Sequence, residues 1–180
     1  MTADQGEILL PIARAAIHQV LALPLEADES ALWLAEQGAC FVTLTQHGEL
    51  RGCIGSLLAH RPLLHDVKAN AVAAALHDPR FLPLTQTELP HTRVEVSLLS
   101  PMQPLNFEDE QDALAQLHPE VDGVVLEYGR HRSTFLPQVW EQLPTPREFM
   151  AHLKHKAGLP IDFWSPGVQL LRYTVEKWKE

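Results

Sequence analysis

Residues 40–57 read CFVTLTQHGELRGCIGSL, and this stretch decides the fold class. Its two halves, 40–45 and 50–57, are rich in β-branched, aromatic and aliphatic residues, and the segment between them carries a glycine. Runs of this kind around a short glycine-containing turn predict a β-hairpin. The hairpin also carries a cysteine, so the fold and a candidate chemistry meet in one segment.

The register of this hairpin predicts which side chains lie together. A two-residue turn at His47-Gly48 would pair Leu44 with Arg51 and Val42 with Cys53. Because strand residues two apart share a face, Arg51 and Cys53 would project from the same side of the strand. A guanidinium near a thiol favours the thiolate, which is the nucleophilic form.

Glycines bracket this cysteine. Gly52 and Gly55 are positions where a ligand or another backbone can approach the strand closely. Together with Arg51 they are the ingredients of a thiol nucleophile or of an anion-binding strand. The alternative is structural, because a cysteine in a strand commonly fills the core as a small apolar residue.

The rest of the chain alternates helices and strands. Apolar spacing, capping residues and prolines predict helices at 7–23, 28–37, 62–78, 107–117 and 145–158. Alternating patterns predict strands at 91–100 and 168–178 and a second hairpin formed by 121–128 and 131–136. Hairpins interleaved with helices, without a βαβ repeat, indicate an α+β fold with an antiparallel sheet flanked by helices. The proline-rich stretch 99–105 is the candidate boundary between two lobes.

Composition narrows the functional class. The chain has 180 residues, with 23 acidic and 14 basic side chains and a formal charge of -9. Such a surface repels phosphate backbones, which argues against a nucleic-acid partner. No apolar run approaches the roughly 18 residues of a membrane span, and the N-terminal residues do not resemble a signal peptide. With two cysteines, we expect a cytoplasmic protein with reduced thiols.

The hexapeptide Leu50-Arg51-Gly52-Cys53-Ile54-Gly55 resembles the hallmark of the AMMECR domain family, called AmmeMemoRadiSam system protein A in prokaryotes. Further blocks follow in the family's order and cover nearly the whole chain: Asp78-Pro79-Arg80-Phe81, 94–100, Asp122-Gly123-Val124, 134–140, and 156–160 with Trp164.

The resemblance carries several expectations. It implies a single domain over residues 1–180, divided into a larger and a smaller lobe with a cleft between them and the hexapeptide at the cleft. It also implies functional association with a Memo-like protein and a radical S-adenosylmethionine enzyme. His77 departs from the pattern, since a less polar residue is expected before Asp78, so its role is not taken from the family.

Further polar residues are candidates for the same site. Asp78 and Arg80 can brace the loop after a helix, or Arg80 can join Arg51 in binding a carboxylate or phosphate. Glu95 lies on the polar face of its strand and becomes the natural general base if that face lines the cleft. Otherwise it belongs to a solvated face. Thr134 follows the second hairpin turn and can supply a hydroxyl.

No metal or cofactor motif is found. His152 and His155 share a helix face, but no nearby motif supplies the third protein ligand that zinc or iron sites need. The sequence has no CxxC, HExxH, P-loop or GxGxxG arrangement. We therefore expect solvent-facing histidines and no cofactor.

Two functional hypotheses result. In the first, the protein is an enzyme in which Cys53 attacks a small anionic substrate, oriented by Arg51 and Arg80, with Glu95 as the base. In the second, it is a non-catalytic binding or accessory module that presents the same cleft to a partner or ligand. In that case Arg51 is an anchor and Cys53 fills space.

Overall fold

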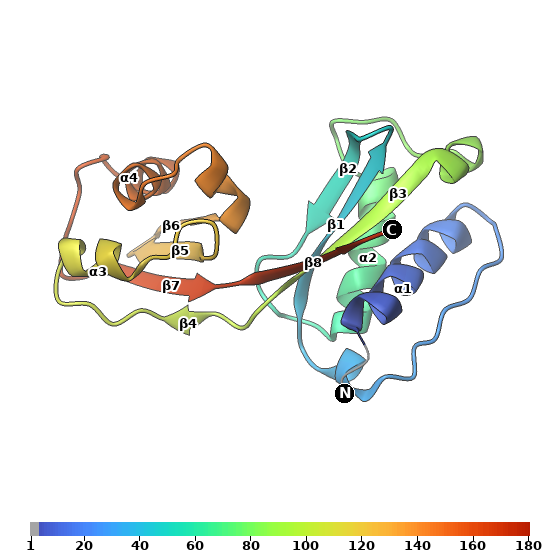
Figure 1. The fold of residues 1–180 in the computed structure, drawn as a ribbon, viewed down its shortest axis with the longest axis horizontal. Helices are drawn as coiled ribbons and strands as arrows, with labels where there is room; N and C mark the ends of the chain where they lie inside the picture. Colours follow the sequence, from blue (N-terminus) through green and yellow to red (C-terminus); the bar gives the residue numbers. More distant parts are fainter. Residues whose placement is uncertain (1–3) are drawn as a thin grey trace. The chain divides into compact units, whose positions relative to one another are not determined.

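The computed structural model describes residues 4–180, which form two compact units. One unit runs to Leu99 and takes up the chain again at Glu176–Glu180, and the other comprises Ser100–Val175. Each unit has its own four-stranded sheet (Figure 1). The α+β fold predicted from the sequence is confirmed.

The sheet of the first unit has the strand order β2-β1-β3-β8. Its strands are β1 (Ala39–Gln46), β2 (Glu49–Gly55), β3 (Thr92–Leu99) and β8 (Val175–Lys179). The helices α1 (Gln5–Val20) and α2 (Leu63–Leu76) pack on one face of this sheet (Figure 1). Two short 3-10 helices complete the unit, η1 (Leu32–Ala35) and η2 (Gln86–His91).

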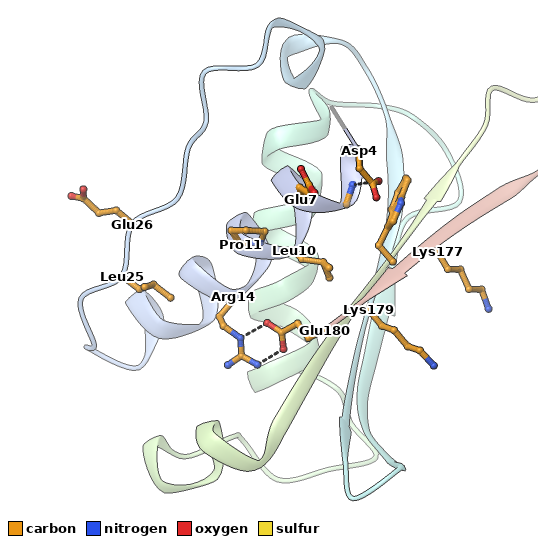
Figure 2. A pocket seen from close by; sticks show the side chains of 12 residues that line it. Asp4, Glu7, Leu10, Pro11, Arg14, Leu25, Glu26, Lys177, Lys179 and Glu180 are labelled. Carbon is orange, nitrogen blue, oxygen red and sulfur yellow. Dashed lines mark hydrogen bonds and ion pairs between the residues drawn. The ribbon is translucent and has the colours of Figure 1, made fainter. Parts of the chain in front are cut away.

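The C-terminal residues fasten α1 to the sheet. Glu180 accepts hydrogen bonds from the Arg14 side chain of α1 (Figure 2) and also from the backbone N–H of Val94. On the same face, a side chain at Gly6 would have its Cβ only 2.3 Å from Cγ of Trp178. Glycine at this position therefore allows the indole of β8 to lie directly against α1.

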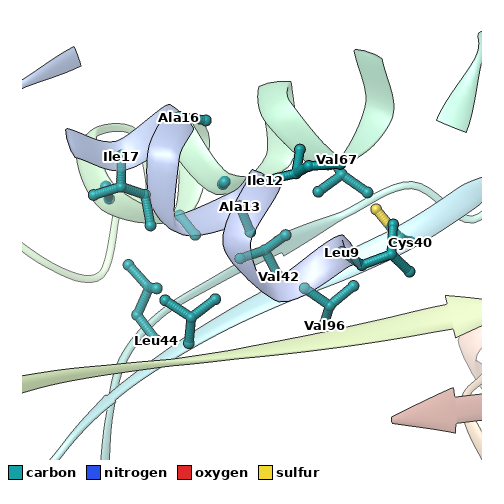
Figure 3. Packing of buried hydrophobic residues seen from close by; sticks show 14 of the residues in the cluster. Leu9, Ile12, Ala13, Ala16, Ile17, Cys40, Val42, Leu44, Val67 and Val96 are labelled. Atoms are coloured by element: carbon teal, nitrogen blue, oxygen red, sulfur yellow. The ribbon is translucent and has the colours of Figure 1, made fainter. Parts of the chain in front are cut away.

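The core of the first unit follows from the alternation in β1. Cys40, Val42 and Leu44 are completely buried and face the helices, whereas the residues between them point to the other side. Leu9 and Ile12 of α1 pack against them (Figure 3), together with other buried members of the cluster: Ala13, Ala16, Ile17, Val67 and Val96. Removal of this apolar surface from water is the main stabilising contribution of the helix–sheet interface.

The first hairpin forms, but its register differs from the prediction. His47 and Gly48 both have positive φ, 52° and 81°, which suits a tight two-residue hairpin turn. Thr45 still pairs with Leu50, but Leu44 pairs with Gly52, which leaves Arg51 as an extra residue.

This β-bulge makes the predicted Leu44–Arg51 and Val42–Cys53 pairs wrong. Beyond the bulge, Cys53 lies opposite Thr43 and Ile54 lies opposite Val42. Cys53 is therefore on the face of the sheet away from the two helices.

Two predicted helices are shorter than expected. Of residues 28–37 only η1 is helical, because the Asp28 carboxylate accepts the Ser30 N–H in a local turn and Gln37 forms a bridge with Pro62. The helix predicted at 107–117 is α3 (Glu110–Gln116), which begins after its N-cap Asp109.

The second unit has the strand order β4-β7-β5-β6. The predicted second hairpin is confirmed by β5 (Gly123–Tyr128) and β6 (His131–Phe135), and β4 (Gln103–Pro104) and β7 (Gln169–Tyr173) complete the sheet. The helix α4 (Pro146–Lys156) begins where the sequence predicted, with the Thr145 hydroxyl accepting the Glu148 N–H. Its Phe149 stacks on Trp140 of η3 (Pro137–Glu141) at 3.8 Å between ring centroids.

The single strand predicted at 168–178 is in fact two strands. Thr174 separates β7, in the sheet of the second unit, from β8, in the sheet of the first. At this break Thr174 accepts the Ser100 N–H through its carbonyl and donates its own N–H to the Ser100 hydroxyl, both at 2.8 Å. The second unit is therefore an insertion between β3 and β8, and its two ends lie side by side.

Within residues 4–180, no helix combines the length and the apolar character that a membrane crossing requires.

Candidate functional site

Cys53 lies in β2, which is an edge strand, and its thiol is partly exposed. Thr43 of β1 is its cross-strand partner, with 3.3 Å between the Thr43 Oγ1 and the Cys53 Sγ. Such a close side-chain approach is typical of a non-hydrogen-bonded antiparallel pair, in which the backbone groups of both residues point outward. The N–H and C=O of Cys53 therefore point to the open edge of the sheet.

Asp78 and Arg80 occupy this edge. The Asp78 Oδ2 accepts the Cys53 N–H at 2.9 Å, and Nη2 of Arg80 donates to the Cys53 carbonyl at 3.4 Å. The two side chains also bind each other, through Nε at 3.0 Å and Nη2 at 2.7 Å. This ion pair thus satisfies the backbone of the edge strand at one residue, as a further strand would.

The pair has strong electrostatic consequences. Hydrogen bonding from the Arg80 guanidinium holds the pKa of Asp78 well below its usual range, despite burial, and the N–H groups of Cys53 and Arg80 add to this. The hydrogen bond to Asp78 in turn raises the pKa of Arg80, and the negative charge of Asp78 raises it further. Asp78 is almost fully buried, whereas the Arg80 side chain is 54% exposed.

Local sequence explains this arrangement. The helix α2 ends at Leu76, and His77 is its exposed C-cap, with its N–H bonded to the Ala73 carbonyl. The Asp78 Oδ1 then accepts the Arg80 N–H at 3.0 Å, a short side-chain turn that directs both side chains toward β2.

Arg51, the bulged residue, binds Glu88 of η2. Its Nε and Nη2 lie 3.1 and 3.4 Å from the two carboxylate oxygens of Glu88. Burial by itself would raise the pKa of Glu88, but hydrogen bonds from the Thr85 backbone and hydroxyl, from Arg51 and from Gln46 lower it to about 2. Sequence reasoning missed Glu88, although the capping-box spacing from Thr85 to Glu88 was a usable signal.

Phe81 brings the two arginines together. The guanidinium carbon of Arg51 lies 5.8 Å from the centroid of the Phe81 ring, and that of Arg80 lies 5.5 Å from it. These distances suit cation–π contacts. Each arginine therefore has a carboxylate partner as well as the shared aromatic ring.

The two glycines of the hexapeptide are approached by the protein itself. A Cβ at Gly52 would lie 2.1 Å from the carbonyl oxygen of Ala74, so α2 packs on β2 at a distance that only glycine allows. A Cβ at Gly55 would lie 2.2 Å from the ring of Phe41, its cross-strand partner.

Glu95 of β3 lies in the same row as Cys53, with Thr43 between them. Two strand spacings separate the backbones of Cys53 and Glu95 by about 10 Å, so the carboxylate does not contact the thiol directly. Thr134 is in the second unit, on β6, where its hydroxyl lies 3.1 Å from the phenolic oxygen of Tyr173.

The second cysteine is a useful reference. Cys40 is fully buried, and Asp66 accepts its N–H at 2.9 Å and lies 3.3 Å from its Sγ. Burial, followed by the negative charge of Asp66, raises the pKa of the Cys40 thiol far above its ordinary value. Three further side chains donate to Asp66 and complete the network: Ser56, Arg61 and Asn70.

Among residues 4–180, no three His, Cys, Asp or Glu side chains gather in a group that could hold a metal ion. His152 and His155 are exposed on α4.

The sequence and the fold of this chain are similar to those of known proteins. Residues 10–178 match the AMMECR1 family. Protein MJ0810 of Methanocaldococcus jannaschii is 35% identical over 189 residues, covering 100% of this chain and 92% of that protein. A Thermotoga maritima protein is 39% identical over 160 residues, covering 86% of each. The crystal structure of protein PH0010 from Pyrococcus horikoshii superposes with a TM-score of 0.82 at 31% identity, over 99% of this chain and 93% of that one.

Proposed function

The chain belongs to the AMMECR1 family, and we propose that the surroundings of Cys53 are an enzyme active site in which the thiol attacks a small anionic substrate. The observation that carries this proposal is a partly exposed thiol on the residue whose backbone carbonyl accepts a hydrogen bond from an immobilised, half-exposed guanidinium, that of Arg80. A neighbouring cation favours the thiolate and can bind the anionic group of a substrate.

Each residue has a distinct role in this proposal. Asp78 fixes both the backbone of Cys53 and the guanidinium of Arg80, and Thr43 holds the sulfur by its hydroxyl. Nε and Nη2 of Arg80 are bonded to Asp78 and Cys53, so Nη1 is the nitrogen that would bind substrate.

The reaction is a nucleophilic substitution. The Cys53 thiol first releases its proton to solvent, and a lone pair on the resulting thiolate forms the bond to an electrophilic carbon, while the electron pair of the broken bond departs with the leaving group. Glu95 lies in the same row two strands away and does not contact the thiol, so it would accept a proton from the substrate or from water and not from Cys53.

A pathway context accompanies this proposal. The resemblance of the sequence to AmmeMemoRadiSam system protein A supports a role beside a Memo-like protein and a radical S-adenosylmethionine enzyme. An accessory subunit of such a pathway need not perform chemistry, so the second hypothesis is retained.

A non-catalytic binding module is favoured by one specific observation. Arg51 and Arg80 are already neutralised by Glu88 and Asp78, and the described residues place no general base against the thiol. In that case Arg80 and Phe81 form the contact surface, and Cys53 serves only to anchor β2.

Alkylation of the native protein separates the two hypotheses, with Cys40 as the internal control. Iodoacetamide at neutral pH should modify Cys53 rapidly and Cys40 only after unfolding, as read by peptide mass spectrometry. Arg80→Gln should slow the reaction at Cys53, whereas Arg130→Gln, at an exposed arginine in the β5–β6 turn, should not. If Cys53 is modified only after unfolding, or Cys53→Ser retains function in vivo, the enzymatic hypothesis is wrong.

A further inference from the structure

β8 forms one edge of the first sheet, and hydrogen bonds at its two ends fix its orientation. Glu180 donates its N–H to the Val94 carbonyl, and Thr174 accepts the Ser100 N–H. In an antiparallel pair the peptide groups of successive residues point alternately toward and away from the partner. The backbone N–H and C=O groups of residues 174, 176, 178 and 180 therefore point toward β3, and those of Lys177 and Lys179 point away from the sheet.

A groove follows this edge. It has a volume of about 740 Å³ and lies between β8, one flank of α1 and the segment after α1 (Figure 2). Its lining is mixed: Leu10, Pro11, Leu25 and Trp178 are apolar, and Asp4, Glu7 and Glu26 bring carboxylates to the same groove. The groove is a built feature, because Gly6 lets the Trp178 indole lie against α1 and the Arg14–Glu180 ion pair joins α1 to the end of β8.

The two faces of β8 differ in character. Trp178 packs on the helix side, and the side chains of Lys177 and Lys179 project to the other side (Figure 2). Both lysines are exposed. A strand added next to β8 would therefore meet positive charge on one face. On the other face it would meet a groove whose apolar side chains lie beside carboxylates, so that apolar residues of the strand are accepted there and acidic ones are repelled.

We propose that the edge of β8 binds an extended segment of a partner protein by β-strand addition, with acidic and apolar residues alternating along that segment. Its backbone would pair with the outward N–H and C=O groups of Lys177 and Lys179. Its acidic residues would face the two lysine side chains, and its apolar residues would enter the groove beside Trp178. This inference is independent of Cys53 and of the proposed enzymatic function.

Charge selects this occupant over a second copy of the chain. Antiparallel pairing of β8 with β8 would bring Lys177 and Lys179 next to the same lysines of the other copy, and like charges on paired strands are destabilising. Lysines on an edge strand commonly prevent self-association in this way. An acidic partner strand converts the same charges into a favourable contact.

Amide hydrogen exchange of the full-length chain tests the proposal at single residues. The probe is a capped peptide of sequence TEVELET. We expect the amides of Lys177 and Lys179 to exchange rapidly in the free protein and at least about tenfold more slowly with peptide. The amide of Trp178, which faces β3, should be protected in both states. Unchanged exchange at Lys177 and Lys179 under a large excess of peptide overturns the proposal.

Variants provide the controls. Lys177→Pro removes only an outward N–H, so it should keep the circular dichroism spectrum and lose peptide binding. Should this variant fail to fold, Lys177→Glu/Lys179→Glu replaces it and should reverse the preference toward a TKVKLKT peptide. A peptide of the same composition without alternation should bind weakly. Equal binding of all three peptides argues against an acidic partner strand. So does sedimentation that shows the parent chain self-associating and the double variant remaining monomeric, because a second copy of the chain would then occupy the edge of β8.

Discussion

The two cysteines of this chain lie on paired strands of one sheet, and the same contact holds both backbones. A buried aspartate accepts the N–H of each cysteine at 2.9 Å: Asp66 at Cys40, and Asp78 at Cys53. Each aspartate is in turn paired with an arginine.

The two clusters differ in where the thiol lies. At Cys40 the aspartate also contacts the sulfur, and the thiol is sealed in the core with a raised pKa. At Cys53 the aspartate touches only the backbone, and the sulfur projects to the other side, next to Thr43. The same type of carboxylate–amide contact therefore has two different results. At Cys40 it is part of the packed interior, and at Cys53 it fixes the edge strand and leaves the thiol accessible.

The largest loss of stability should come from substitution of Asp66, in the buried cluster around Cys40. Asp66→Ala leaves the donors of Cys40, Ser56, Arg61 and Asn70 without their acceptor, and we expect a loss of about 3 kcal/mol or more in the free energy of unfolding. Urea titration measures it. The control is Glu29→Gln, which breaks an exposed pair with Lys68 and should cost less than about 1 kcal/mol. Equal stability of the two variants would contradict a structural role for the Asp66 network.

The next effect concerns the approach of α2 to the strand that carries Cys53. Gly52→Ala places a methyl group against the Ala74 carbonyl, which belongs to a helix backbone and cannot move alone. We expect a loss of about 2–3 kcal/mol in urea titrations. Gly55→Ala meets only the Phe41 ring, a side chain that can rotate, and should cost less. The reverse order would show that α2 adapts more easily than the ring.

Substitution of Asp78, at the edge of the sheet beside Cys53, should lower the free energy of unfolding moderately and in a pH-dependent way. Asp78→Asn keeps the shape but loses the charge, and we expect a loss of about 1–2 kcal/mol at neutral pH. Because the folded-state pKa of Asp78 is depressed, its contribution is present above the unfolded value of about 3.9 and is lost as the pH falls below it. The stability difference between parent and variant should therefore be constant above about pH 5 and shrink toward pH 3. A difference that grows on acidification would contradict this assignment.

The smallest effect concerns Arg51. Arg51→Met removes one of the groups that lower the pKa of Glu88, so this pKa should rise from about 2 toward the ordinary value near 4.3, since burial then acts with less opposition. A carbon-detected NMR titration of the Glu88 carboxyl measures the change. The parent chain should lose the stability contributed by Glu88 between those two pH values, and the variant should lose less, because the difference between its folded and unfolded pKa values is smaller. An unchanged Glu88 pKa would mean that Thr85 and Gln46 suffice.

The sequence predicted the positions of helices, strands and turns better than it predicted which residues pair across the strands. The turn at His47-Gly48 was correct because two residues that tolerate positive φ are a local signal. The bulge at Arg51 was not visible, because an extra residue changes no local propensity and appears only once β1 and β2 are aligned. It moved Thr43, which no pattern had singled out, to the position opposite Cys53.

The long alternating segment at 168–178 shows the same limit. Periodicity indicates that a segment is extended, but not which sheet it joins. The change from one sheet to the other at Thr174 therefore could not be predicted from the alternating pattern. Asp66 escaped notice for a related reason. A charged residue on a helix is normally exposed, and its burial depends on donors from β1, from Ser56 and from Arg61, which come together only in the fold.

The insertion of the second unit between β3 and β8 also constrains how the chain folds during synthesis. The first sheet acquires three of its strands early, but β8 emerges only after the whole of Ser100–Val175 has left the ribosome. Until then β3 is an unprotected edge, open to pairing with other nascent chains. The hydrogen-bonded junction of Ser100 and Thr174 then shortens the delay, because once the second unit has folded its two ends are already adjacent and β8 is delivered next to β3.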